Sequence, residues 1–92
     1  MKITYDPVKR EKTLLDRGVD FADSVAVFSG RTLDQVDERR DYGEERIVTV
    51  GRLRGRMMIV VWTARGDTRH IISMRKANER EQARFGERLG EN

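Results

Sequence analysis

The chain has 92 residues and a formal net charge of +3; 38% of the residues are charged, 37% are hydrophobic, none is cysteine and one is histidine. This composition predicts one small domain over residues 1–92 and excludes disulfide scaffolds, thiol nucleophiles and cysteine-ligated zinc, so we expect neither a metal nor another cofactor. The longest apolar run, residues 57–62, is far shorter than the roughly 20 residues of a membrane span, and we expect a cytoplasmic protein without a membrane contact.

Two helices are predicted in the N-terminal third. The first begins at Asp6-Pro7, a cap followed by proline at the first helical position, and ends at Gly18. The second begins at the cap Asp20 and ends at Gly30. Their apolar stripes, which we expect to face the core, are Val8, Leu14 and Leu15 in the first helix and Phe21, Val25 and Phe28 in the second.

Three β-rich runs follow in the second half of the chain. They cover residues 47–50, 57–63 and 70–74, after a candidate short strand at 32–36 and a charged loop at 37–43. Glycines between the runs favour hairpin turns, and a mostly solvent-facing helix is predicted over residues 76–88. The fold class is α+β, with two N-terminal helices packed on an antiparallel β-sheet meander and a C-terminal helix.

Basic residues concentrate in this β-rich half. Residues 1–45 carry 8 Lys/Arg against 11 Asp/Glu, whereas residues 46–92 carry 11 against 5. Of the 19 basic residues, 15 are arginine, whose planar guanidinium suits phosphate groups. An anionic partner is therefore expected at the second half of the chain.

Strand alternation predicts where these arginines point. Arg69, Ser73 and Arg75 share one side of the third run, and Arg46 and Arg52 behave likewise on the first. If these two strands flank the central one, four arginines could frame a single sheet face. Two interpretations of these arginines stay open: they form a groove for the RNA backbone, or they are ordinary solvated arginines at strand ends.

Three further positions have competing interpretations. Trp62 is either a core aromatic residue or a platform for base stacking. His70 falls on the strand side opposite Arg75, which favours a partly buried histidine over a general base. Arg75-Lys76 lies where a strand meets the amide-rich start of the last helix, which favours a phosphate site.

Several segments closely resemble the BrnT toxins, and the resemblance covers almost the whole chain. They are residues 5–7 with Lys9, and residues 17–23, 41–46, 50–51, 60–63 and 69–81. The most specific parts are Glu45-Arg46 before the first long strand and the block Ile71-Ile72-Ser73-Met74-Arg75-Lys76-Ala77. The resemblance implies a type II toxin with a RelE/ParE-like fold that acts as a ribonuclease and is held inactive by a tightly bound antitoxin.

The same resemblance implies roles for individual residues. Phosphate contacts fall on Arg46, Arg69, Arg75 and Lys76, and further substrate contacts on Arg52, Trp62 and Ser73. Glu45 is the nearest acidic candidate for the base that a cofactor-free ribonuclease needs, and its other possible role is to pair with a strand arginine.

The function expected on this basis is a metal-independent endoribonuclease that cleaves RNA and inhibits translation. Its partners would be RNA and a BrnA-like antitoxin, and operator DNA would be contacted only through the antitoxin. Two alternatives stay open: a non-enzymatic module that binds an antitoxin or nucleic acid in operon autoregulation, and a poison of a protein target.

Overall fold

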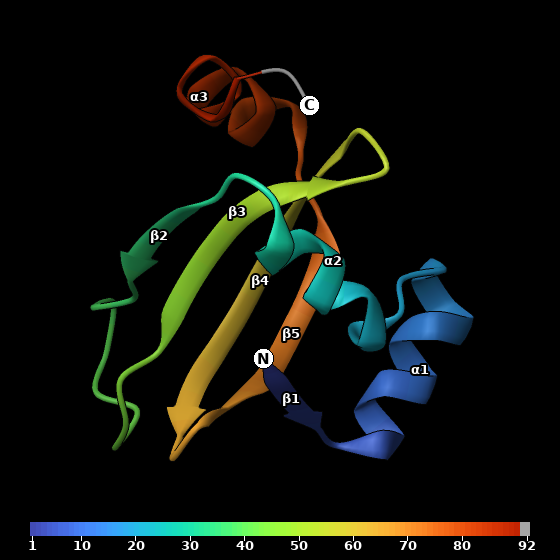
Figure 1. The fold of residues 1–92 in the computed structure, drawn as a ribbon, viewed down its shortest axis with the longest axis vertical. Helices are drawn as coiled ribbons and strands as arrows, with labels where there is room; N and C mark the ends of the chain where they lie inside the picture. Colours follow the sequence, from blue (N-terminus) through green and yellow to red (C-terminus); the bar gives the residue numbers. More distant parts are fainter. Residues whose placement is uncertain (91–92) are drawn as a thin grey trace.

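The computed structural model describes residues 1–90 and contains, within that range, one mixed five-stranded sheet and three α-helices (Figure 1). In chain order the elements are β1 (Lys2–Tyr5), α1 (Pro7–Arg17), a 3-10 turn η1 (Phe21–Asp23), α2 (Ser24–Ser29), β2 (Leu33–Val36), β3 (Ile47–Leu53), β4 (Arg56–Arg65), β5 (Thr68–Lys76) and α3 (Glu79–Leu89). The strands lie in the order β1-β5-β4-β3-β2, with β1 parallel to β5 and the other neighbours antiparallel. The predicted α+β class is confirmed.

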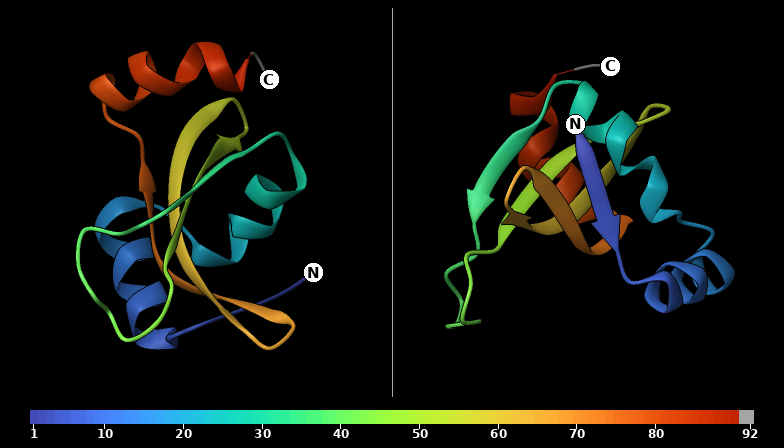
Figure 2. Two further views of the ribbon diagram at one scale, coloured as in Figure 1. Left: turned by 90° about the vertical axis from the view of Figure 1, so that its left-hand side faces the viewer. Right: turned by 60° about the horizontal axis from the view of Figure 1, so that its bottom comes forward.

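Different helices cover the two faces of the sheet, as Figure 2 shows. On the face that we call the α2 face, side chains of the central strands pack against η1 and α2; the buried residues include Val60, Trp62 and Ile71 from the sheet and Phe21, Val27 and Phe28 from the helical segments. On the opposite face, the α3 face, one end of the sheet packs under α3; the buried residues here are Val50, Met57, Ile59, Ala77 and Leu89. Within residues 1–90, Val48 and Val61 on this face are only partly buried.

The first helix differs from its prediction. The three apolar side chains expected in the core are exposed: Val8 at 75%, Leu14 at 37% and Leu15 at 80%, and α1 buries no residue at all. The reason is β1, a strand that the sequence analysis missed. It takes the edge of the sheet beside β5, and the turn at Asp6 then directs α1 along that edge rather than onto a face.

The second predicted helix is interrupted. The Asp20 side chain accepts a hydrogen bond from the Ala22 backbone amide and so caps the start of η1. The helix α2 begins only at Ser24. Phe21 and Phe28 are buried as predicted, whereas Val25 is 39% exposed and its assignment to the core is wrong. The short 3-10 turn changes the helical phase between positions 21 and 25.

A β-bulge in β5 alters the expected alternation of side chains. Val61 pairs with Ser73 and Trp62 pairs with Ile71, so Ile72 is an extra residue on β5. The Lys9 ammonium of α1 donates a 2.7 Å hydrogen bond to the carbonyl oxygen of Ile72, so this carbonyl at the bulge has a hydrogen-bond partner.

The bulge places Arg69 and Arg75 on opposite faces of the sheet. Paired residues of neighbouring strands share a face, so Arg69, opposite Ala64, lies on the α2 face. Ser73 and Arg75 lie on the α3 face, opposite Val61 and Ile59. The prediction of one shared face is therefore wrong, because strict alternation fails across an extra residue.

The last helix begins later than predicted. Asn78 caps it, accepting the Glu81 amide at 2.8 Å while Glu81 accepts the Asn78 amide at 2.9 Å, so the first helical residue is Glu79. Lys76, expected at the helix start, is the last residue of β5. No helix in residues 1–90 has the length and apolar character to cross a membrane.

Two glycines should respond oppositely to alanine substitution. A Cβ on Gly51 in β3 would lie 2.7 Å from Val27 Cγ1, whereas one on Gly86 in α3 would meet nothing within 4 Å. We expect Gly51→Ala to destabilise the protein by about 1–3 kcal/mol through overpacking, and Gly86→Ala to stabilise it by about 0.5–1 kcal/mol through helix propensity. Urea unfolding of both variants measures these changes in the free energy of unfolding. Equal midpoints for the two variants would contradict the close approach of α2 to β3.

Candidate functional site

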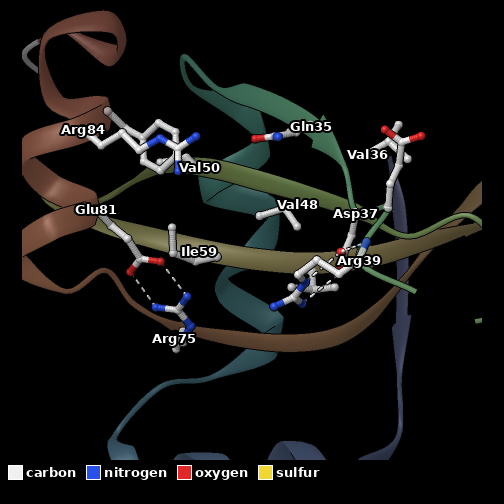
Figure 3. A pocket seen from close by; sticks show the side chains of 13 residues that line it. Gln35, Val36, Asp37, Arg39, Val48, Val50, Ile59, Arg75, Glu81 and Arg84 are labelled. Carbon is white, nitrogen blue, oxygen red and sulfur yellow. Dashed lines mark hydrogen bonds and ion pairs between the residues drawn. The ribbon is translucent and has the colours of Figure 1, made fainter. Parts of the chain in front are cut away.

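An open groove of about 520 Å³ lies on the α3 face, between α3 and the segment that follows β2 (Figure 3). We call it the α3 groove. Its floor is apolar and comes from the central strands: Val48, Val50, Ile59 and Val61. Its walls are charged, with Asp37, Glu38 and Arg39 on one side and Arg75, Glu81 and Arg84 on the other. Such a surface can hold an anionic ligand that also has apolar groups.

Arg75 is fixed in this groove by Glu81. Both terminal nitrogens of Arg75 donate 2.7 Å hydrogen bonds, one to each carboxylate oxygen of Glu81, in a bidentate pair. Glu81 is itself oriented by the capping box at Asn78. These hydrogen bonds from Arg75 lower the pKa of Glu81 to about 2. The start of α3 thus positions an arginine on β5, and the guanidinium has little freedom left to lose when it binds an anion.

A second pair lies across the groove. Arg39 donates two 2.9 Å hydrogen bonds to Asp37, and the Tyr42 hydroxyl donates a third to the same carboxylate at 3.1 Å. Chiefly because of Arg39, the pKa of Asp37 lies well below its ordinary value. The positive charge of Arg39 acts on Arg75, so both arginines contribute to the potential of one groove.

Arg84 adds a third arginine from α3. Its guanidinium carbon lies 5.1 Å from the centre of the Phe85 ring, and among residues 1–90 it has no carboxylate partner. Glu81 and Asp37 are both bound to arginines and are weak bases. The groove therefore offers cations for phosphate, and among its three carboxylates only Glu38 stands outside these arginine pairs within residues 1–90.

One candidate proton acceptor, His70, lies at the other end of the α3 face, where the backbone of Glu45 also passes. The hydroxyl of Thr63 donates a 2.7 Å hydrogen bond to the backbone carbonyl of Glu45, and Thr63 pairs with His70 across β4 and β5. Glu45 is exposed, whereas His70 is half-buried, with its Nδ1 2.9 Å from the Thr4 hydroxyl oxygen. Burial lowers the pKa of His70, so the imidazole is neutral near pH 7.

This position corrects the prediction for His70. The bulge brings His70 to the same face as Arg75, so that His70, Ser73 and Arg75 follow one another along the α3 face of β5. The expected partial burial of His70 is confirmed, but its expected location on the opposite strand side is wrong.

The structure brings some of the other predicted residues to this face. Arg46 precedes β3, with its guanidinium carbon 4.0 Å from the Tyr42 ring centre and its Nε 3.9 Å from a Glu44 oxygen. Arg52 lies in register with Met57, but its guanidinium donates hydrogen bonds of 3.2 and 2.7 Å to the Gly90 carbonyl and so holds the end of α3. Arg52 therefore has a structural role in this fold.

Three predicted residues lie away from the groove. The Arg69 guanidinium stacks over Phe28 and Trp62 at 4.6 and 4.4 Å on the α2 face. Trp62 is 7% exposed and donates a 2.8 Å hydrogen bond to the Thr49 hydroxyl, which confirms the core reading and leaves no accessible ring face for a base. Lys76 is exposed at the end of β5, in register with Met58 on the α2 face. The predicted frame of four arginines on one face is wrong.

Sequence reasoning missed Arg39, Glu81 and Arg84. Arg39 lay in a segment treated only as a charged connector, and Arg84 in a helix treated as a solvated surface. Glu81 had a usable signal: asparagine followed three residues later by glutamate is typical of a capping box, and it marks both the helix start and the carboxylate nearest to Arg75.

The Arg75–Glu81 pair predicts a specific dependence of stability on pH. Because folding lowers the pKa of Glu81 from 4.5 to about 2, the ionised pair stabilises the protein above about pH 4.5, and this contribution is lost as the pH falls towards 2. We expect Glu81→Gln to flatten the loss of thermal stability over that range. Glu87→Gln removes an exposed carboxylate of the same helix and is the control. Identical slopes for Glu81→Gln and the wild type would contradict the pair.

The chain matches the model of a known protein family. A family model described as "Ribonuclease toxin, BrnT, of type II toxin-antitoxin system" matches residues 5–81. No curated protein matches the chain. The matched range includes Arg39, Arg46, Arg75 and Glu81.

Proposed function

Because the chain belongs to the BrnT family of ribonuclease toxins of type II toxin–antitoxin systems, we propose that it is a metal-independent endoribonuclease that cleaves RNA and thereby inhibits translation. A cognate, BrnA-like antitoxin that binds operator DNA would neutralise it. The proposal includes the RelE/ParE-like fold and action in the cytoplasm.

The observation that carries this proposal is the fixed guanidinium of Arg75 in the α3 groove. Cleavage of RNA through the 2′-hydroxyl passes through a phosphorane that carries more negative charge than the phosphate. A preoriented cation stabilises that extra charge without rearranging at the moment of reaction. Arg75 is held by two hydrogen bonds, and Arg39 and Arg84 flank it.

We place the reacting phosphate over Ser73. Ser73 lies between His70 and Arg75 on the α3 face, so side chains from both directions along β5 can reach a group above it. Arg75 is two residues away, about 7 Å along a strand, which a long arginine side chain spans. Arg46, beyond the His70 end, would contact a neighbouring phosphate. Arg69 and Lys76 have no part in this arrangement, since both lie on the α2 face.

The base would take the proton of the 2′-hydroxyl while its oxygen attacks phosphorus. The bond to the 5′-oxygen then breaks, and that oxygen takes up a proton, leaving a 2′,3′-cyclic phosphate. Glu45 and His70 are the two candidate bases: His70 pairs with Thr63 on the α3 face, and Glu45 meets Thr63 through its backbone carbonyl. A neutral imidazole suits this task at pH 7.

Cleavage assays with the purified chain in EDTA test the proposal. We expect RNA cleavage to persist without metal, with cyclic-phosphate ends. Removing the true base, by Glu45→Gln or His70→Gln, should lower kcat about 10²–10⁴-fold and abolish the acidic limb of the pH–rate profile.

The contrary outcomes are equally definite. Loss of cleavage in EDTA would contradict the metal-independent mechanism, and full activity in both base variants would contradict the location of the base. A folded wild-type chain that neither cleaves RNA nor slows growth on induction would favour the non-enzymatic binding module.

A further inference from the structure

A second hollow, of about 580 Å³, lies between α1 and β5, and we call it the α1 groove. Lys9, Lys12 and Arg17 line it from α1, and Ile72, Ser73 and Arg75 line it from β5. Arg75 thus belongs to both grooves, which lie on either side of it. Ser73, over which we place the reacting phosphate, also lines this hollow, but the cations of α1 have no part in the proposed chemistry.

One wall of the α1 groove is an unpaired strand edge. β1 pairs with β5 only from Thr68 to Ile71, and within residues 1–90 no other strand adjoins that side of β5. The Ala77 amide donates to the Met57 carbonyl on β4, so strand alternation turns the backbone groups of Met74 and Lys76 to the open side. The Ile72 carbonyl already accepts the Lys9 hydrogen bond, and the Lys76 carbonyl accepts a long one, 3.4 Å, from Arg75. The Met74 amide and carbonyl and the Lys76 amide are left for an extended chain that adds as a strand.

The positive charge of the α1 groove indicates the charge of the segment that binds there. The α1 wall has three cations, Lys9, Lys12 and Arg17, against one carboxylate, Asp16, which is 3.5 Å from the Lys12 ammonium. Arg75 adds a fourth cation from β5. An acidic segment is the complementary partner.

A polypeptide fits this site better than RNA does. Only a peptide backbone matches the spacing of free amides and carbonyls along β5. The outer side of α1 also presents Val8 and Leu15, 75% and 80% exposed, and such apolar side chains are covered by protein rather than by a phosphate backbone.

We propose that an extended acidic segment of the cognate antitoxin adds as a strand to β5 beside residues 72–76, with its carboxylates against Lys12, Arg17 and Arg75. This proposal rests on the proposed function, since it identifies the partner as the antitoxin. Because Arg75 is shared between the grooves, a carboxylate bound there occupies the cation that RNA needs, and neutralisation follows from competition for one guanidinium.

Arg17→Glu and Arg88→Glu form a matched pair of variants. Each replaces an arginine in the last turn of a helix, so both lose a similar favourable interaction with the helix dipole, but only Arg17 lines the α1 groove. The probe is the protein encoded by the reading frame adjacent to this chain, purified as the complex. We expect Arg17→Glu to weaken the complex at least tenfold in a binding titration, and Arg88→Glu to leave it unchanged.

Hydrogen–deuterium exchange of the wild-type complex locates the contact. The Met74 and Lys76 amides should exchange more slowly in the complex than in the free chain. Equal affinity of both variants, or unprotected Met74 and Lys76 amides in the complex, would overturn the proposal.

RNA cleavage separates this proposal from the proposed function. Arg17→Glu should cleave RNA at the wild-type rate when alone and resist inhibition by the partner. Loss of cleavage in Arg17→Glu, together with protection of the same amides by an RNA oligonucleotide, would assign the α1 groove to RNA. This result would overturn the proposal that an antitoxin segment binds there. If the wild type does not cleave RNA but the partner still contacts the α1 groove, only the proposed ribonuclease activity is overturned.

Discussion

Arg75→Ala should slow RNA cleavage by a hundredfold or more, on the order of the loss of one preorganised electrostatic donor. The side chain is fixed by two 2.7 Å hydrogen bonds to Glu81 and is 41% exposed, so it is both oriented and accessible to a phosphate. Single-turnover cleavage of a defined RNA, normalised to the folded fraction, measures the effect.

Two variants separate charge from orientation. Arg75→Lys should recover activity only in part, because an ammonium cannot form the bidentate pair with Glu81. Glu81→Gln keeps the cation but loosens it, so the reduction in cleavage should be smaller than for Arg75→Ala. If Arg75→Ala cleaves RNA like the wild type while Glu45→Gln or His70→Gln does not, the phosphate lies nearer to Arg46 than to Arg75.

Phe21→Ala should destabilise the protein by about 3–5 kcal/mol, a large part of the stability of a small domain. Phe21 is 1% exposed in the core cluster of the α2 face, and its ring packs edge-on against Tyr5 of β1 with centroids 6.2 Å apart. The substitution removes buried surface and leaves a cavity between η1 and the sheet. Chemical denaturation gives the change in the free energy of unfolding.

Leu15→Ala is the matched control. It removes a large apolar side chain that the sequence pattern also assigned to the core, but Leu15 is 80% exposed, and we expect a change within about 0.5 kcal/mol. A large loss of stability in Leu15→Ala with little change in Phe21→Ala would mean that α1, and not η1, covers the sheet.

Local signals in the sequence determined much of the secondary structure. The cap at Asp6-Pro7, the positive-φ glycine Gly18 that ends α1, and the β-rich runs of β3, β4 and β5 need only short stretches of chain to be recognised. The burial of Phe21 and Phe28 also followed from their pattern. The concentration of arginine predicts an anionic partner, and this stays a prediction.

The tertiary structure alone decided which face each functional side chain occupies. Periodicity gives the relative direction of neighbours only while the strand is regular, and the extra residue Ile72 reverses that direction between Arg69 and Arg75. The bulge is stabilised by Lys9, which is 63 residues away in sequence from Ile72, so no local sequence pattern predicts the bulge. Likewise, the orientation of α1 depends on β1 reaching β5 at the far end of the chain. The sequence determined which side chains are available for the site, whereas long-range pairing determined which of them meet, because those contacts join segments that lie far apart along the chain.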